Sequence, residues 1–328
     1  MSRLGVLTSG GDAPGMNAAV RSVVRTAARE GWETIGFRRG FTGLLDNQTL
    51  PLGPRDVANI LQRGGSIIDT SRERRFKDSE LRHKALESLE AHDCRALVVI
   101  GGEGSQQGAA ALQEVWDGAV VGVPSTIDND LGGTDQSIGF DTACNTALEA
   151  IDRIRDTASS LDRLFFIEVM GRNRGFIALD VAVAGGAEAV VLPEEPLDAE
   201  WLLEMIRSNY ERGKLSCIIV VAEGGHPGGA RGLLQEIGER LVALRLPGAE
   251  PRVTILGHIQ RGGYPTVRDR VLASRLASMA TRAAIAGRGG VLCGVRGNEV
   301  RETPIADAIA EEKSIDRELL EMVNALAG

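Results

Sequence analysis

Cysteines are few and scattered in this sequence. The 328-residue chain holds four, Cys94, Cys144, Cys217 and Cys293, and no two of them form a C-x-x-C pair. We therefore expect buried, reduced thiols in a cytoplasmic protein rather than a disulfide framework.

Long apolar runs and a leader pattern are also missing. No apolar run approaches the ~18 residues of a membrane span. The first residues, MSRLGVLTSGG, have the pattern of a strand rather than of a signal peptide. We expect a cytoplasmic protein with no membrane partner.

Basic residues are in deficit, since 37 Lys and Arg face 45 Asp and Glu, a net charge of −8. Such a chain lacks the basic surface that non-specific nucleic-acid binding needs, so we expect no nucleic-acid partner. A local basic pocket for a small phosphorylated ligand stays compatible with this charge. Hydrophobic residues make up 43% and charged residues 25%, the balance of a soluble globular protein.

What is present is an alternation of short apolar runs and helical patterns. The runs are LGVLTS, ALVVIGG, AVVGVPS, LFFIEVMG, AVVLPE, CIIVVAEGG and RVTILGHIQ. Helical patterns such as GMNAAVRSVVRTAAREG lie between them. The alternation predicts an α/β fold with parallel sheets covered on both faces, and the number of runs predicts two lobes. Ligands of such sheets bind at the carboxyl ends of the strands.

Two glycine-rich loops follow apolar runs. In TSGGDAPGMNAAVR, Gly10 and Gly11 allow close backbone approach, and the helix that follows Pro14 can bind an anion at its N-terminus. LVVIGGEGSQQGA resembles a dinucleotide loop, but Glu103 would repel a phosphate unless Mg²⁺ lies between them. The alternatives are an ordinary turn in the first loop and a solvent-facing glutamate in the second.

The segment VPSTIDND, residues 123–130, is dense in polar groups. Asp128 and Asp130 would share a face of an extended segment, and one of them can act as general base for a hydroxyl nucleophile. The alternative is an Asx turn. Arginines also stand near strand ends, together with His258: Arg72, Arg163, Arg172, Arg174, Arg252 and Arg261. Guanidinium groups suit phosphates, so the whole set indicates phosphoryl transfer.

Five segments carry a resemblance to a known family. GVLTSGGDAPGMNAAVR, IGGEGS, STIDNDLGGTD, FIEVMGRNRG and LGHIQRGG occur in order along nearly the whole chain, and together they resemble the bacterial ATP-dependent 6-phosphofructokinases. The resemblance implies two Rossmann-like three-layer lobes with mainly parallel sheets and the active site in the cleft between them. It implies a large nucleotide-binding lobe in residues 1–139 and 260–310. Residues 140–259 and 311–328 would form a small sugar-phosphate-binding lobe.

The resemblance also implies a reaction and the residues that perform it. The γ-phosphoryl group of ATP would pass to the 1-hydroxyl of fructose 6-phosphate with Mg²⁺, the committed step of glycolysis. Asp128 matches the general base, and Arg72 and Arg172 match the residues that stabilise the transferring group. The donor set is Gly11, Arg72, Gly102, Glu103, Gly104, Ser105 and Gly108, with Glu103 as metal ligand. The acceptor set is Thr126, Asp128, Asp130, Met170, Gly171, Arg172, Glu223, His258 and Arg261. Arg163 and Arg252 would join it from a neighbouring subunit, and the family usually forms a homotetramer.

An allosteric site for a nucleoside diphosphate or phosphoenolpyruvate is implied as well, with Arg21, Arg25, Arg155, Glu188 and Lys214 as candidates. Here the sequence departs from the family at Pro54, beside Arg55, where an arginine is usual, and at Arg212, where a lysine is usual.

Ser125 and Gly104 bear on the choice of phosphoryl donor. Ser125 stands where ATP-using relatives often have glycine and pyrophosphate-using relatives often have lysine. A separate departure is Glu103, which stands in the magnesium loop where the family usually has aspartate. Gly104 leaves room for a nucleotide where pyrophosphate users tend to carry aspartate, so we expect ATP. The alternatives are pyrophosphate as donor and an inactive sugar-phosphate or nucleotide sensor. A nicotinamide-dependent dehydrogenase would leave the arginines unexplained.

Overall fold

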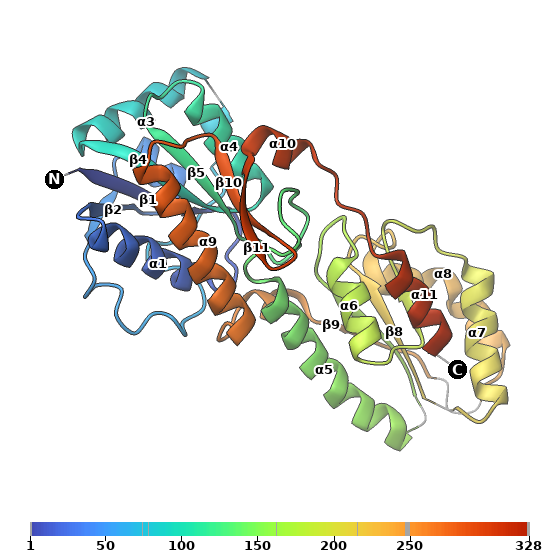
Figure 1. Ribbon diagram of the computed structural model, residues 1–328. Coiled ribbons are helices and arrows are strands. Elements are labelled where there is room, and N and C mark those ends of the chain that lie inside the picture. The colour runs from blue at the N-terminus through green and yellow to red at the C-terminus, as the bar shows by residue number, and fades with distance from the viewer. Residues whose placement is uncertain are drawn as a thin grey trace. The chain divides into compact units, whose positions relative to one another are not determined.

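The structure is a computed structural model that describes residues 2–73, 75–77, 79–161, 163–214, 216–246 and 250–326 (Figure 1). The chain divides into two compact units. Unit 1 comprises Met1–Thr142 and Arg261–Lys313, and unit 2 comprises Ala143–Gln260 and Ser314–Gly328.

Unit 1 is built on one sheet. Within its described residues seven strands follow the order β11-β10-β5-β4-β1-β2-β3. Their bounds are β1 (Arg3–Ser9), β2 (Glu33–Phe37), β3 (Thr49–Leu52), β4 (Cys94–Gly101), β5 (Ala119–Pro124), β10 (Val291–Arg296) and β11 (Glu299–Pro304). The five central strands are parallel, and the edge strands β3 and β11 are antiparallel to their neighbours. The loops after β1, β4 and β5 therefore meet at one edge of the sheet.

Helices cover both faces of this sheet (Figure 1). They are α1 (Met16–Arg29), α2 (Phe41–Leu45), α3 (Ser79–Ala91), α4 (Glu103–Gln113), α9 (Val267–Ile285) and α10 (Ile305–Ala310), with a 3₁₀ turn, η1, at Arg75–Lys77. In α1 the buried side chains include Met16, Val20, Val23 and Ala27, the spacing of one helical face. A core of strand residues such as Phe37 and Leu97 packs against α2, α3, α4 and α10 on the opposite side.

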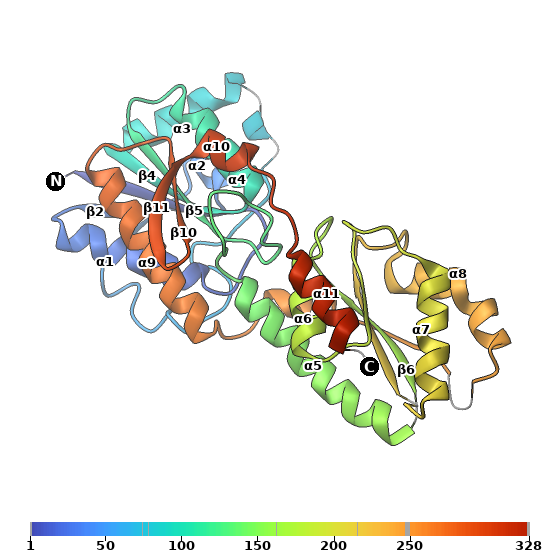
Figure 2. The ribbon, with the colours of Figure 1, turned by 45° about the vertical axis from the view of Figure 1, so that its right-hand side comes forward.

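Unit 2 holds a smaller sheet, in which the described strands follow the order β7-β8-β6-β9 and are all parallel. They are β6 (Leu164–Val169), β7 (Ala189–Val191), β8 (Cys217–Ala222) and β9 (Arg252–Ile255). Helices α7 (Ala199–Glu211) and α8 (Gly229–Ala243) lie on one side, and α6 (Phe176–Ala184) and α11 (Arg317–Leu326) on the other (Figure 2). Helix α5 (Phe140–Leu161) begins in unit 1 and continues in unit 2, and η2 spans Gly257–Arg261.

The predicted fold class is confirmed: both units are α/β, with mainly parallel strands and helices on both faces. Cys94, Cys217 and Cys293 are buried, and none of the four cysteines forms a disulfide. Burial raises the pKa of the Cys94 and Cys293 thiols to about 12, so both stay protonated near neutral pH. In the part of the chain that the structure describes, no helix is both long and apolar enough to cross a membrane.

Candidate active site

The strand ends of unit 1 bring the two glycine loops and the acidic segment together. Ser9 pairs with Gly101 and Gly101 with Pro124, so β1, β4 and β5 end side by side. A β-carbon on Gly102 would lie 3.3 Å from the Thr126 Cβ. The Ser125 amide donates to the Gly101 carbonyl over 3.0 Å. The second glycine-rich loop, which contains Gly101 and Gly102, is therefore in direct contact with Ser125 and Thr126 of the acidic segment.

The acidic segment forms a turn in which the amide side chain of Asn129 is the structural group. Asn129 has a φ of 52°, a left-handed conformation that asparagine tolerates better than most residues. Its Oδ1 accepts from the Ser137 amide over 3.0 Å and from the Ser137 hydroxyl over 3.2 Å. Asp128 is buried, and its amide donates to the Thr126 Oγ1 over 3.1 Å. Asn129 therefore closes the turn between Asp128 and Asp130.

Arg72 is exposed, and its segment is fastened to the first glycine loop. The Thr70 hydroxyl donates to the Gly10 carbonyl over 3.0 Å, and the Gly10 amide donates to the Ser71 carbonyl over 2.9 Å. This pair of bonds fixes the backbone of the Arg72 segment beside the loop that contains Gly11.

Glu73, which sequence reasoning missed, anchors the other flank of Arg72. Its side chain is only 7% exposed, accepts from the Thr42 hydroxyl over 3.0 Å and pairs with Arg75 at 2.6 Å. Arg75 lowers the pKa of Glu73, and Arg75 also reaches Asp46 at 3.2 Å. The alternating charges of residues 72–75 (RERR) were the available signal in the sequence, but they do not reveal that the glutamate is buried.

Gly11 and Arg261, which the resemblance assigns to different ligands, lie against each other in unit 1. The Arg261 Nη1 donates to the Asp12 carbonyl over 3.2 Å. A β-carbon on Gly11 would lie only 2.8 Å from this nitrogen, so any side chain at position 11 would displace the guanidinium group. Glycine at position 11 thus makes room for the guanidinium group of Arg261.

The residues of the second loop differ in what surrounds them. Glu103 is exposed in the first turn of α4, and its Oε1 accepts from the side-chain Nε2 of Gln107 over 2.9 Å. A β-carbon on Gly104 would meet nothing within 4 Å, whereas one on Gly108 would lie 2.8 Å from the Phe41 ring. Gly108 is therefore required by packing, and Gly104 faces open space. Ser105 is buried, and a β-carbon on Gly10 would lie 3.3 Å from the Ser105 Oγ.

A metal ion at Glu103 would find one accessible carboxylate there. Among the described residues no group of three or more His, Cys, Asp or Glu side chains could hold an ion by itself. Mg²⁺ commonly keeps several waters and uses one or two carboxylates plus substrate phosphates. An exposed glutamate beside an open glycine fits that mode of binding.

Other predicted acceptor residues lie in unit 2, after the neighbouring strands β6 and β8. The Glu223 amide donates to the Val169 carbonyl over 2.9 Å, and the Glu223 Oε1 accepts from the Arg172 amide over 2.5 Å. Arg172 has a φ of 52°. Glu223 therefore holds the turn that contains Gly171 and Arg172.

The remaining members of the acceptor set are dispersed over unit 2. The Met170 amide donates to Gln260 over 3.4 Å, in the 3₁₀ turn that also contains His258. Arg163 precedes β6, and Arg252 begins β9, where it pairs with Glu250 at 2.6 Å.

The effector candidates form two groups. In unit 2 the buried Glu188 pairs with Lys214 at 3.0 Å and with Arg155 at 3.8 Å, and it also accepts from the Ile218 amide. In unit 1 Arg21 and Arg25 are neighbours on α1, and burial and the charge of Arg25 lower the pKa of Arg21. Two cationic groups with different surroundings are thus present, one in each unit.

Comparisons with known proteins point in one direction. Residues 3–284 match the family model described as Phosphofructokinase. The chain is 56% identical to ATP-dependent 6-phosphofructokinase 1 of Thermus thermophilus, with 100% of both chains covered. It is 47% identical to ATP-dependent 6-phosphofructokinase of Caldanaerobacter subterraneus subsp. tengcongensis, again over 100% of both. The solved phosphofructokinase from Saccharomyces cerevisiae matches with a TM-score of 0.89 and 32% identity. That match covers 100% of this chain and 48% of the yeast chain, about half its length.

Proposed function

The chain belongs to the phosphofructokinase family, and from this premise we propose that it transfers the γ-phosphoryl group of ATP to the 1-hydroxyl of fructose 6-phosphate. The observation that carries the proposal is the buried Asp128, held in a turn beside Thr126 and next to the loop of Gly102. A fixed carboxylate beside a phosphate-binding loop is what general-base catalysis of phosphoryl transfer requires.

The proposed roles follow from this placement. Asp128 accepts the proton of the 1-hydroxyl while the hydroxyl oxygen forms its bond to the γ-phosphorus. The bond between that phosphorus and the β–γ bridging oxygen breaks, and ADP leaves with the electron pair. Arg72 and Arg172 stabilise the negative charge of the transferring group. Glu103 would hold Mg²⁺, whose charge would offset that of the donor phosphates.

We propose that unit 1 supplies the base and the donor contacts, and that unit 2 supplies most sugar-phosphate contacts. The acceptor residues would be Thr126, Asp130, Met170, Gly171, Glu223, His258 and Arg261. Arg163 and Arg252 would complete the site of a neighbouring copy in a homotetramer. Exposed apolar side chains at Tyr264 (76%), Val267 (79%) and Val271 (51%) support association, because such side chains are commonly covered in interfaces.

ATP is favoured over pyrophosphate by the open space at Gly104, which leaves room for the rest of a nucleotide. The names of both curated relatives also specify ATP. An inactive sensor and a nicotinamide-dependent dehydrogenase find no support in these comparisons. We also propose that the protein is cytoplasmic. An allosteric effector would bind the cluster of Glu188, Arg155 and Lys214 in unit 2, and Arg21 and Arg25 on α1 in unit 1.

The test is a coupled assay with fructose 6-phosphate and either ATP or pyrophosphate. Asp128→Ser should lower kcat roughly 10²–10⁴-fold, the usual weight of general-base catalysis, with little change in the KM of either substrate. Asp117→Ser, at an exposed position of unit 1, is the matched control. Activity with pyrophosphate alone, or a near-normal kcat in Asp128→Ser, would contradict the proposal.

A further inference from the structure

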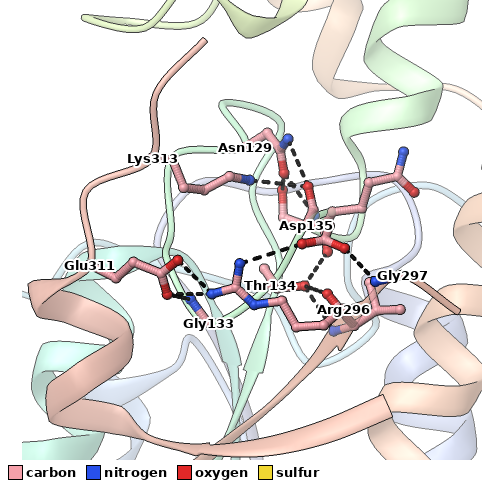
Figure 3. A network of polar contacts seen from close by, with 11 residues as sticks. Asn129, Gly133, Thr134, Asp135, Arg296, Gly297, Glu311 and Lys313 are labelled. Carbon is pink, nitrogen blue, oxygen red and sulfur yellow. Dashed lines mark hydrogen bonds and ion pairs between the residues drawn. The ribbon is translucent and has the colours of Figure 1, made fainter. Parts of the chain in front are cut away.

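The far end of the Asp128 turn is fastened to residues 311–313, the last segment of unit 1 (Figure 3). The Gly133 amide donates to the Glu311 Oε2 over 2.8 Å. Arg296 pairs with Glu311 at its Oε1 over 2.5 Å and with the Asp135 Oδ1 over 3.4 Å. The Gly297 amide donates to the Asp135 Oδ2 over 2.6 Å. Backbone and side-chain contacts therefore join this turn to both β10 and the segment after α10.

Lys313 contacts the Asp128 turn at the backbone of Asp135. Its Nζ donates to the Asp135 carbonyl over 3.1 Å, and the Nδ2 of Asn129 donates to the same oxygen over 3.3 Å (Figure 3). One carbonyl oxygen thus links the ammonium group to the residue between Asp128 and Asp130. Because Asn129 is in the left-handed conformation, loss of its contacts would change the direction of both neighbouring carboxylates.

The charges around Lys313 are unevenly balanced. Partial burial of Lys313 opposes its ammonium form, Asp135, Asp130 and Glu311 favour it, and Arg296 opposes it. Burial prevails and lowers the pKa of Lys313 to about 8. Within the described residues the buried Asp130 Oδ1 has no hydrogen-bond partner, so the ammonium charge is a compensating influence on that carboxylate.

We propose that Lys313 is a positioning residue for the transfer reaction. Through the Asp135 carbonyl and Asn129 it holds the turn that carries Asp128 and Asp130, and its charge balances that of Asp130. The role rests on the proposed function, since it serves the base of that reaction. A displacement of about 1 Å in such a group can cost 10²-fold in rate.

The experiment compares Lys313→Met, Lys313→Arg and the control Lys84→Met, at an exposed lysine of α3. With ATP and fructose 6-phosphate, Lys313→Met should lower kcat roughly 10- to 100-fold, with the KM for ATP within about twofold of wild type. Lys313→Arg, which keeps the charge and a donor, should recover most of the loss, and Lys84→Met should match wild type. A normal kcat in Lys313→Met, or no recovery in Lys313→Arg, would overturn the proposal.

The pH profile and hydrogen exchange give independent readouts. The kcat of the wild type should fall as pH rises through about 8, because Lys313 then loses the charge that faces Asp130, while Lys313→Arg should stay level. Amides of residues 126–137 should exchange faster in Lys313→Met than in wild type, whatever the substrate. A wild type inactive with fructose 6-phosphate would refute the function, and unchanged exchange in these residues would refute the role of Lys313.

Discussion

Substitution of Gly11 by alanine tests the contact between the first glycine loop and Arg261. The new β-carbon would lie 2.8 Å from Nη1, 3.4 Å from Cζ and 3.7 Å from Nη2 of Arg261. Non-bonded heavy atoms settle at about 3.5 Å or more, so the guanidinium group must move by roughly 0.7 Å. The backbone of Gly11 is outside the left-handed region, so alanine causes no strain there.

The expected magnitude follows from what Arg261 would lose. Its hydrogen bond to the Asp12 carbonyl, 3.2 Å long, would break, and the guanidinium group would be displaced from the acceptor phosphate that we propose it binds. A hydrogen bond to a charged group contributes about 1.5–3 kcal/mol. At 1.4 kcal/mol for each factor of ten, the KM for fructose 6-phosphate should rise about 10- to 150-fold. Because the bond to the Asp12 carbonyl lies within the folded protein, its loss should also lower the free energy of unfolding, by up to about 3 kcal/mol.

The assay is steady-state kinetics with each substrate varied in turn, beside urea unfolding. Gly104→Ala is the control, because its β-carbon meets no protein atom and should leave the KM for fructose 6-phosphate unchanged. In an Arg261→Ala background, Gly11→Ala should add little, since the two changes act on one contact. An unchanged KM for fructose 6-phosphate in Gly11→Ala, or full additivity with Arg261→Ala, would refute the reasoning.

Two further predictions concern groups that anchor the site. Asp269 is buried on α9 and accepts from the Gly139 amide, the Thr142 amide and the Thr142 hydroxyl. In urea titrations Asp269→Ala should lower the free energy of unfolding by about 1–3 kcal/mol for each of these donors that is left without a partner. Burial raises the pKa of Asp269, so the folded chain binds a proton at this carboxylate more tightly than the unfolded chain does. The difference in free energy of unfolding between wild type and Asp269→Ala should therefore grow as pH falls toward about 3.9. The exposed Asp152→Ala is its control, and equal unfolding midpoints for the two variants would contradict the role of Asp269. Glu73→Gln should lower kcat roughly 3- to 10-fold, because a looser Arg72 segment would stabilise the charge of the transferring group less well. The control Glu87→Gln, at an exposed position, should leave kcat unchanged. Equal kcat values in the two variants would contradict the anchoring role of Glu73.

Much of the fold could be predicted because its signals are local. Short apolar runs that end in glycine or polar residues predict parallel strands, and each predicted run contains a strand in the structure. The side-chain partners could not be predicted in this way. Glu73 and Asp46, far apart in sequence, meet through Arg75, and the sequence has no mark for that meeting.

The site shows the same division between local and distant information. Asp128 and Glu103 stand out because acids are unusual after apolar strands. Lys313 does not, since it lies 178 residues from Asp135 and its contact is to a backbone carbonyl. Gly108 shows how a second constraint can be hidden: its place in a glycine pattern predicts a nucleotide contact, and the Phe41 ring 2.8 Å from a β-carbon built there is a packing demand that the pattern does not reveal.

The antiparallel edge strands of unit 1 have a consequence for assembly. Exposed strand edges are templates for pairing with another chain, and proline and charged residues make them poor templates. Strand β3 carries Pro51, and β11 carries Glu299, Arg301 and Glu302 and ends at Pro304. Both borders of this sheet are thus protected against extension by a second copy. Copies of the chain that associate through unit 1 should therefore do so through helices and loops, which keeps specific assembly separate from aggregation.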